Sequence, residues 1–267
     1  MTSNGLTLWG LLLALAVAAG VPAPGLAQDF TQVEFTSHDL GAGLTLLRGA
    51  GGNLVASVGD DGVFLIDDEY AVLAPKLRAA VAKLSDRPVR FVVSTHWHSD
   101  HTGGNEALAG DGAVLVAHEA VRVRMSRDQF IAGLGRNVPA SPAAALPVVT
   151  FAEGLRLHLN GHAVRVIHVA NAHTDGDALV HFEDAGVLHM GDTYFAGMYP
   201  FIDLSSGGSL EGMIAAVDRG LALCDAKTRV VPGHGPLSDR AQLEDTRAML
   251  ASVRERVSSA IAAGALM

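Results

Sequence analysis

A layered α/β domain is the fold class that the sequence predicts, because short β-rich runs alternate with stretches of helical apolar spacing. The chain has 267 residues. With an N-terminal leader set aside, the remainder is long enough for one sizeable hydrophobic core rather than two. We find no internal sequence repeat. The sequence therefore predicts a single domain that covers residues 28–267.

Residues 1–27 predict a secretory signal peptide. They carry no charged side chain, and Gly25 to Ala27 supplies small residues before Gln28. The apolar stretch from Leu6 to Val21 is shorter than the roughly 20 residues that a bilayer span needs. A basic segment usually precedes such a stretch and is missing here, so an uncleaved N-terminal anchor is the alternative. We expect a periplasmic or secreted protein without stable membrane insertion after cleavage.

The acidic balance of the chain argues against a nucleic acid partner. The formal net charge is −9 at pH 7. Lys and Arg are scattered rather than clustered into the basic patch that nucleic acid binding requires. Cys224 is the only cysteine, which excludes an intrachain disulfide. We expect a small-molecule substrate, and the sequence leaves the oligomeric state open.

Three short strands and a helix are predicted before residue 85. The helix covers 70–84, where apolar residues recur at helical spacing. A Gly-Asp-Asp-Gly turn joins the last two strands as a hairpin. The strands cover 44–47, 53–58 and 62–67.

Three histidines and an aspartate lie within six residues, directly after the apolar run 89–93, which predicts a buried strand. Because His96, His98, Asp100 and His101 follow the end of that strand, their side chains can converge at the mouth of the fold. Imidazole and carboxylate groups are the ligands of zinc and its first-row neighbours. Four ligands are too many for one catalytic ion that keeps an open position, and they suit two adjacent ions. The alternative is a polar loop without metal.

The middle of the chain contains a strand, a helix and then an irregular segment. The strand is predicted over 113–117 and the helix over 119–127. Two glycines and three prolines interrupt residues 128–147. A connection of this length in a compact domain is usually functional or disordered. We interpret it as a flap beside the substrate, with a disordered insertion as the alternative.

The second half predicts further strands and two helices. Ser209 is a candidate N-cap for a helix over 210–221, and a closing helix covers about 239–260. The strands cover 155–159, 164–169, 178–182, 187–190 and 229–231.

The order His-x-His-x-Asp-His followed by Thr-Gly-Gly-Asn resembles the signature loop of the metallo-β-lactamase fold superfamily. Three later motifs resemble that family's remaining metal ligands: Asn-Ala-His-Thr-Asp around His173, Met-Gly-Asp-Thr around Asp192, and Pro-Gly-His-Gly around His234. The resemblance spans about residues 53–235 and implies a four-layer αββα sandwich with the site at one edge between the sheets. It also implies that Asp67 supports the metal loop from behind, with an ordinary acidic turn as the alternative.

A pair of zinc ions is the cofactor that the resemblance implies. A hydroxide that bridges the ions would attack a carbonyl, and Asp100 would also accept or return a proton. Tyr194 or Tyr199 is a candidate donor to the developing oxyanion, and Ser205 and Ser206 are candidates for holding a substrate carboxylate. The first ion is expected on His96, His98 and His173, and the second on Asp100, His101 and His234, with Asp192 bridging.

The expected function is a zinc-dependent hydrolase of a small ester, lactone or amide. The leading alternative is a metallo-β-lactamase that hydrolyses β-lactam antibiotics. Two other classes remain: an iron-dependent sulfur dioxygenase, and a metal-binding module without activity. The full set of seven ligands argues against the module, because a structural site needs only one closed coordination sphere. The sequence does not distinguish lactam, lactone and ester.

Overall fold

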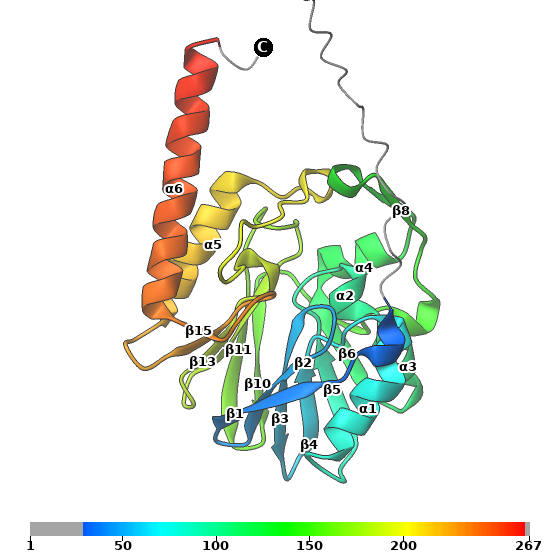
Figure 1. Cartoon of the computed structure of the whole chain (residues 1–267). Helices are drawn as coiled ribbons and strands as arrows, with labels where there is room; N and C mark the ends of the chain where they lie inside the picture. Colours follow the sequence, from blue (N-terminus) through cyan, green and yellow to red (C-terminus); the bar gives the residue numbers. More distant parts are fainter. Residues whose placement is uncertain (1–28, 265–267) are drawn as a thin grey trace, which may run out of the picture.

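Two β-sheets lie face to face at the centre of the computed structural model, and helices cover the outer face of each (Figure 1). The structure describes residues 29–264, so the predicted leader at 1–27 lies outside the described residues. None of the described helices has the length and apolar character that crossing a bilayer requires.

The first sheet has seven strands in the order β1-β2-β3-β4-β5-β6-β9. Strands β1 to β4 form an antiparallel meander, whereas β4, β5, β6 and β9 run parallel. Strands β1 and β9 were not predicted: β1 is mostly exposed and β9 has only three residues. The strands are β1 (Thr36–Gly41), β2 (Leu44–Arg48), β3 (Asn53–Gly59), β4 (Gly62–Ile66), β5 (Val89–Val93), β6 (Val114–His118) and β9 (Val149–Phe151).

The second sheet has six strands in the order β10-β11-β12-β13-β14-β15. All its neighbours pair antiparallel except β13 and β14, which run parallel. The strands are β10 (Gly154–Leu159), β11 (His162–His168), β12 (Ala178–Phe182), β13 (Val187–His189), β14 (Arg229–Val231) and β15 (Ser238–Asp239). Within the segment 128–147, β7 (Gln129–Ile131) and β8 (Arg136–Val138) pair as a separate hairpin.

Six α-helices accompany the sheets in the part of the chain that the structure describes. In α5 the hydroxyl of Ser209 accepts a hydrogen bond from the Gly212 N–H at 3.0 Å, which confirms the predicted cap. The predicted helix over 70–84 is shorter than expected, because a 3₁₀ turn at Ala71–Leu73 precedes it and Pro75 lies in its first turn. The helices are α1 (Ala74–Ala82), α2 (Ser99–Thr102), α3 (Asn105–Gly110), α4 (Glu119–Met125), α5 (Leu210–Leu223) and α6 (Arg240–Ala262).

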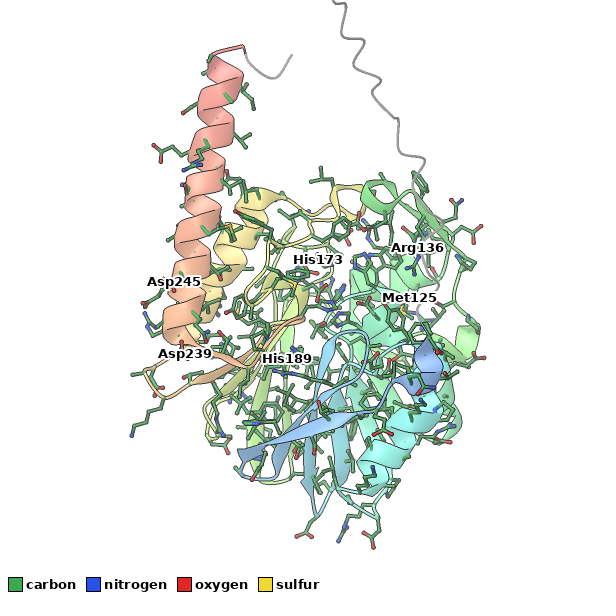
Figure 2. The ribbon with its side chains drawn as sticks, viewed as in Figure 1. Met125, Arg136, His173, His189, Asp239 and Asp245 are labelled. Atoms are coloured by element: carbon green, nitrogen blue, oxygen red, sulfur yellow. The ribbon has the colours of Figure 1, made fainter. Side chains whose placement is uncertain are left out.

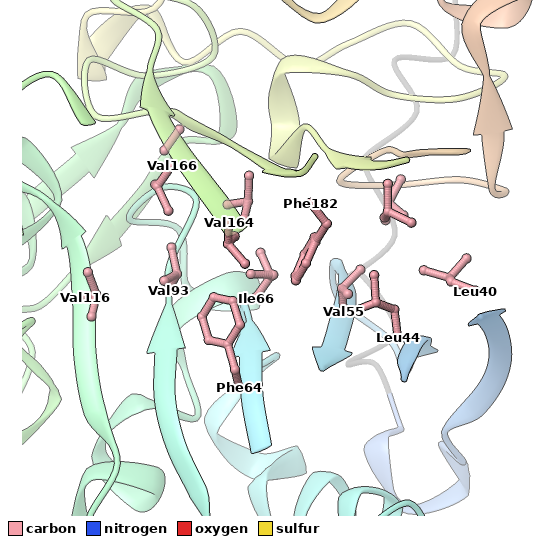
Figure 3. Close-up of a cluster of buried hydrophobic side chains, with 14 of the residues drawn as sticks. Leu40, Leu44, Val55, Phe64, Ile66, Val93, Val116, Val164, Val166 and Phe182 are labelled. Atoms are coloured by element: carbon pink, nitrogen blue, oxygen red, sulfur yellow. The ribbon is translucent and has the colours of Figure 1, made fainter. Parts of the chain in front are cut away.

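The central strands are buried on both faces, and alternate residues belong to different cores. Phe64 and Ile66 of β4 face the second sheet, whereas Leu65 packs toward the helices. Val164, Val166 and Phe182 come from the second sheet to complete the core between the sheets (Figure 3).

Two of the further apolar cores within residues 29–264 cover the outer faces of the sheets. Leu77 of α1 and Leu108 of α3 pack on the outer face of the first sheet. Val217 of α5 and Leu243 of α6 pack on the outer face of the second. Three apolar layers separate four layers of secondary structure, which confirms the predicted αββα fold class.

Truncation of Phe182 tests this packing. Its ring is buried, and its centroid lies 6.1 Å from that of Phe64 across the two sheets. We expect Phe182→Ala to lower the free energy of unfolding by about 3–5 kcal/mol, measured as a lower urea midpoint at unchanged slope. The control Val72→Ala removes a side chain that is 59% exposed and is expected to change stability by less than about 0.5 kcal/mol. Equal midpoints for the two variants would contradict a shared core between the sheets.

Candidate metal centre

The ends of four strands bring the seven predicted ligands to one edge of the sandwich. His96, His98, Asp100 and His101 follow β5 on the loop that continues into α2. The other three follow strands of the second sheet: His173 comes after β11, Asp192 after β13 and His234 after β14. Figure 2 shows His173 at the upper end of the sheets. The loops that leave this edge therefore face one another.

The seven side chains form two adjoining groups, in each of which the candidate ligand atoms lie within 4.8 Å of one another. In the first, His98 Nδ1 lies 3.2 Å from His96 Nε2 and 2.8 Å from His173 Nε2. Asp192 Oδ2 lies 3.5 Å from the same nitrogen of His173. Tetrahedral ligands of zinc lie about 3.3 Å apart, so the spacing fits one ion.

The second group consists of Asp100, His101 and His234. Asp100 Oδ2 lies 3.3 Å from His234 Nε2. The carboxylate of Asp192 reaches this group as well, because its Oδ1 lies 3.1 Å from His101 Nε2 and its Oδ2 lies 3.4 Å from His234 Nε2. Asp192 thus lies between the two groups, where the sequence predicts a bridging ligand.

Asp192 Oδ1 is buried and accepts no hydrogen bond of good geometry from the described residues. A buried carboxylate oxygen without a donor is unfavourable, and a cation compensates it. The donor set of imidazole nitrogens and carboxylate oxygens is the one that zinc and its neighbours prefer. The residues present therefore fit a pair of divalent metal ions.

In four of the five clustered histidines, the ring nitrogen that faces away from the centre has a hydrogen-bond partner. Such partners orient a metal-binding histidine and favour the tautomer whose other nitrogen is free to coordinate. The contacts are Thr95 Oγ1 with His96 Nδ1 at 3.1 Å, Asp203 Oδ2 with His98 Nε2 at 3.1 Å, Asp67 Oδ2 with His101 Nδ1 at 2.7 Å, and the Phe201 carbonyl with His173 Nδ1 at 2.8 Å.

Three consecutive buried acids, Asp67 to Glu69, hold the metal loop and the neighbouring loop at Gly51 in place. Asp67 also accepts hydrogen bonds from the Thr95 N–H at 2.7 Å and hydroxyl at 2.8 Å. Asp68 accepts from Gly104 N–H at 2.9 Å, and Glu69 accepts from Gly51 N–H. Burial raises the pKa of both Asp68 and Glu69. Sequence reasoning found Asp67 but missed its two neighbours, although the run of acids at a strand end was visible.

Charge differs between the two groups. Burial lowers the pKa of His96 well below its usual value and that of His173 to about 4, so both rings are neutral at pH 7. Burial opposes the charged form of His234 too, but hydrogen bonds to Asp100 and Asp192 raise its pKa to about 9. A metal ion in the second group would replace the proton on that ring.

A cavity of about 230 Å³ opens onto both groups. Two of its aromatic residues cover metal ligands: Phe195 stacks on His234 at 5.4 Å between centroids, and the Phe201 centroid lies 6.4 Å from that of His98. The segment 128–147 contributes Ile131, Leu134, Arg136 and Val138 to the lining, beside Tyr70. The segment thus lies next to the cavity, as expected for a flap. Tyr70 and Arg136 were missed in the sequence.

The predicted substrate contacts do not line this cavity. Tyr194 is 1% exposed, its hydroxyl hydrogen-bonds to Ser238, and it borders a separate hollow of about 400 Å³ against α6. Tyr199 borders the same hollow and is largely exposed.

Ser205 and Ser206 donate hydrogen bonds to the Asp203 carboxylate, and Ser206 also accepts one from the Trp97 indole at 3.1 Å. The two serines therefore position Asp203, which in turn holds His98. Neither serine lines the cavity, and their role as groups that hold a substrate carboxylate stays a prediction.

Comparison with known proteins places the chain in a family. Residues 49–248 match the sequence model of the metallo-beta-lactamase superfamily. A hydroxyacylglutathione hydrolase of Polaromonas sp. is 33% identical over 58% of this chain and 52% of its own length. The 2,4-dinitroanisole O-demethylase subunit alpha of Nocardioides sp. is 27% identical over 54% of this chain and 41% of its own. The chain spans about half the length of these curated relatives or less.

Solved structures agree on the fold. A metallo-beta-lactamase of Cronobacter sakazakii superposes with a TM-score of 0.68 at 20% identity, over 85% of this chain and 95% of that chain. A metallo-beta-lactamase from Pontibacter korlensis superposes with a TM-score of 0.65 at 20% identity, over 81% of this chain and 99% of that chain. The superfamily match covers most of the chain and includes all seven clustered side chains. The chain therefore belongs to the metallo-beta-lactamase superfamily.

Proposed function

We propose that the protein is a hydrolase with two zinc ions that cleaves a small ester, lactone or amide at its carbonyl group. The observation that carries the proposal is the pair of adjoining ligand groups with Asp192 between them, open to one cavity. A structural zinc site is closed, whereas a catalytic site keeps a position for water or substrate. The relatives named hydroxyacylglutathione hydrolases support an acyl compound as substrate.

The ligand sets give each side chain a role. Zinc ions bound there would activate a water molecule and polarise the substrate carbonyl. Asp100 lines the cavity, so its carboxylate can accept a proton during attack and return it to the leaving group. Phe195 and Phe201 exclude water from the ligand side chains that they cover. The first ion would be held by His96, His98 and His173, and the second by Asp100, His101 and His234, with Asp192 bridging.

The predicted leader supports a location in the periplasm or outside the cell, and the cavity supports a small molecule rather than a polymer as substrate. β-Lactams are carbonyl compounds of similar size, so they belong in the same substrate panel. Sulfur oxidation would need one iron ion rather than two zinc ions. Metal analysis therefore distinguishes a sulfur dioxygenase from a hydrolase.

The metal content of the purified protein is the first prediction of this proposal. We expect about two zinc ions per chain by mass spectrometry of metals, and loss of all turnover on chelation with recovery when zinc is returned. Lactones, aryl esters and cephalosporins form the panel. One iron ion per chain would favour the sulfur dioxygenase, and zinc without turnover of any panel member would favour a non-catalytic module.

Substitution of the ligands should separate catalysis from folding. His96→Ala and Asp100→Asn are expected to lower kcat/KM by at least about 10²-fold, because each removes a metal ligand and Asp100→Asn also removes a proton acceptor. His158→Ala is the control, since His158 is exposed on β10 outside the site, and its rate should match the wild type. A metal-loaded Asp100→Asn variant with normal rates would contradict the role of Asp100.

Asp67 should act on the metal through His101. We expect Asp67→Asn to weaken zinc affinity by about 10–100-fold, because the acceptor for His101 Nδ1–H loses its charge. Competition with a chromogenic chelator measures the affinity. Asp86→Asn is the control, because it removes an exposed carboxylate that precedes β5 and has no contact with His101. Equal affinity in both variants would show that Asp67 has only a structural role.

A further inference from the structure

The side chain of Arg136 in β8 lines the cavity beside the metal centre, and the lining contains no other Lys or Arg of the described residues. Its Nη2 donates a hydrogen bond to Ser99 Oγ at 2.8 Å, which holds the guanidinium next to the residue that precedes Asp100. Figure 2 shows Arg136 and His173 at the same end of the sheets. The hairpin of β7 and β8 therefore carries a positive charge to the mouth of the site.

Arg136 forms no ion pair with a carboxylate of the described residues, whereas eight of the sixteen arginines do. Arg78 pairs with Asp111 at 2.6 Å, and Arg124 pairs with Asp175 at 2.6 Å. No ion pair within residues 29–264 involves Arg136, and its only side-chain hydrogen bond there is the one to Ser99. A guanidinium has five N–H donors, so four remain for a ligand, in the planar arrangement that matches a carboxylate.

The surroundings of Arg136 select the type of ligand. Tyr70 lines the same cavity; burial and the nearby Asp100 carboxylate raise its pKa to about 12, so its hydroxyl keeps its proton. Leu134 and Val138 of the same hairpin segment line the cavity with apolar surface. In the sequence, no Lys or Arg occurs between Asp192 and Arg219, the stretch that supplies Phe195 and Phe201 to the cavity. Apart from the metal ligands and Ser99, the cavity thus offers one guanidinium among apolar and aromatic side chains.

We infer that Arg136 binds a carboxylate of the substrate, so that the preferred substrates are carbonyl compounds with an apolar body and one carboxylate group. This inference rests on the proposed function and narrows its substrate class. Arg136 is a specificity residue in this scheme: it holds a part of the substrate that does not react. Its loss should therefore act on KM for charged substrates more than on kcat.

Two matched pairs of substrates test the inference. In the first pair, 4-acetoxybenzoate and 4-acetoxybenzamide carry the charge or its neutral counterpart on the leaving group. In the second, aryl esters of glutarate and of glutaramic acid carry it on the acyl side. The variants are Arg136→Gln, which removes the charge, and Arg136→Lys, which keeps the charge but loses the paired N–H donors of the planar guanidinium. Arg127→Gln is the control, because it removes one exposed charge near the same hairpin but not from the cavity lining.

The zinc-loaded wild type should prefer the carboxylate member of at least one pair. Arg136→Gln is expected to raise KM for the carboxylate member about ten-fold or more. The kcat for that member and the KM for the neutral member should stay nearly unchanged. Arg136→Lys should fall between, Arg127→Gln should match the wild type, and added salt should weaken the preference. Equal KM values for charged and neutral members in the wild type, or a preference that survives Arg136→Gln, would overturn the inference.

Binding measurements keep the inference separate from the proposed function. The zinc-loaded wild type could bind the four esters without hydrolysing any of them. The proposed function would then fail for esters of this kind. Calorimetry with benzoate and benzamide then decides on Arg136 alone. Tighter binding of benzoate that Arg136→Gln abolishes and Arg127→Gln retains would support the carboxylate site, whereas equal binding of benzoate to both variants would overturn it.

Discussion

The burial of the Asp192 carboxylate among five imidazoles is the constraint on which the rest of the site depends. Both of its oxygens lie within 3.5 Å of histidine nitrogens that come from different loops. A charge removed from water is tolerated only when opposite charge or good donors compensate it. The fold must therefore deliver cations or protons to this point, and the same arrangement prepares two ligand groups that share one carboxylate.

The close approach of the loops imposes further requirements on the backbone. A side chain at Gly233 would begin 2.0 Å from Asp192 Oδ1, so only glycine fits beside the bridging carboxylate. Asp67 and Glu69 have φ angles of +61° and +68°, which non-glycine residues rarely adopt. Their hydrogen bonds to the metal loop and to Gly51 compensate this conformation. Two of the five non-glycine residues with positive φ in residues 29–264 thus lie in the segment that supports the ligand loop.

The sequence predicted the four layers, most of the strands and the seven clustered side chains, because local patterns encode them. Apolar runs such as 89–93 are recognisable as strands, and the spacing of the histidines after that run is recognisable as a ligand set. Arg136 and Asp203 could not be found in this way. Each is a single polar residue in a segment rich in glycine, proline or serine, and its meaning comes from a partner distant in the sequence. Tyr194 shows that sequence proximity can mislead. It lies two residues after Asp192, which suggested a role in the substrate cavity, but its hydroxyl forms a hydrogen bond with Ser238 in β15.

Anomalous X-ray diffraction at the zinc edge from crystals of the zinc-loaded protein tests the central claim most directly. Two peaks about 3.5–4 Å apart are expected, one beside His98 and His173 and the other beside His101 and His234, with the Asp192 carboxylate in contact with both. A single peak, or two peaks of which one has no contact with Asp192, would contradict a shared carboxylate at the centre of the site.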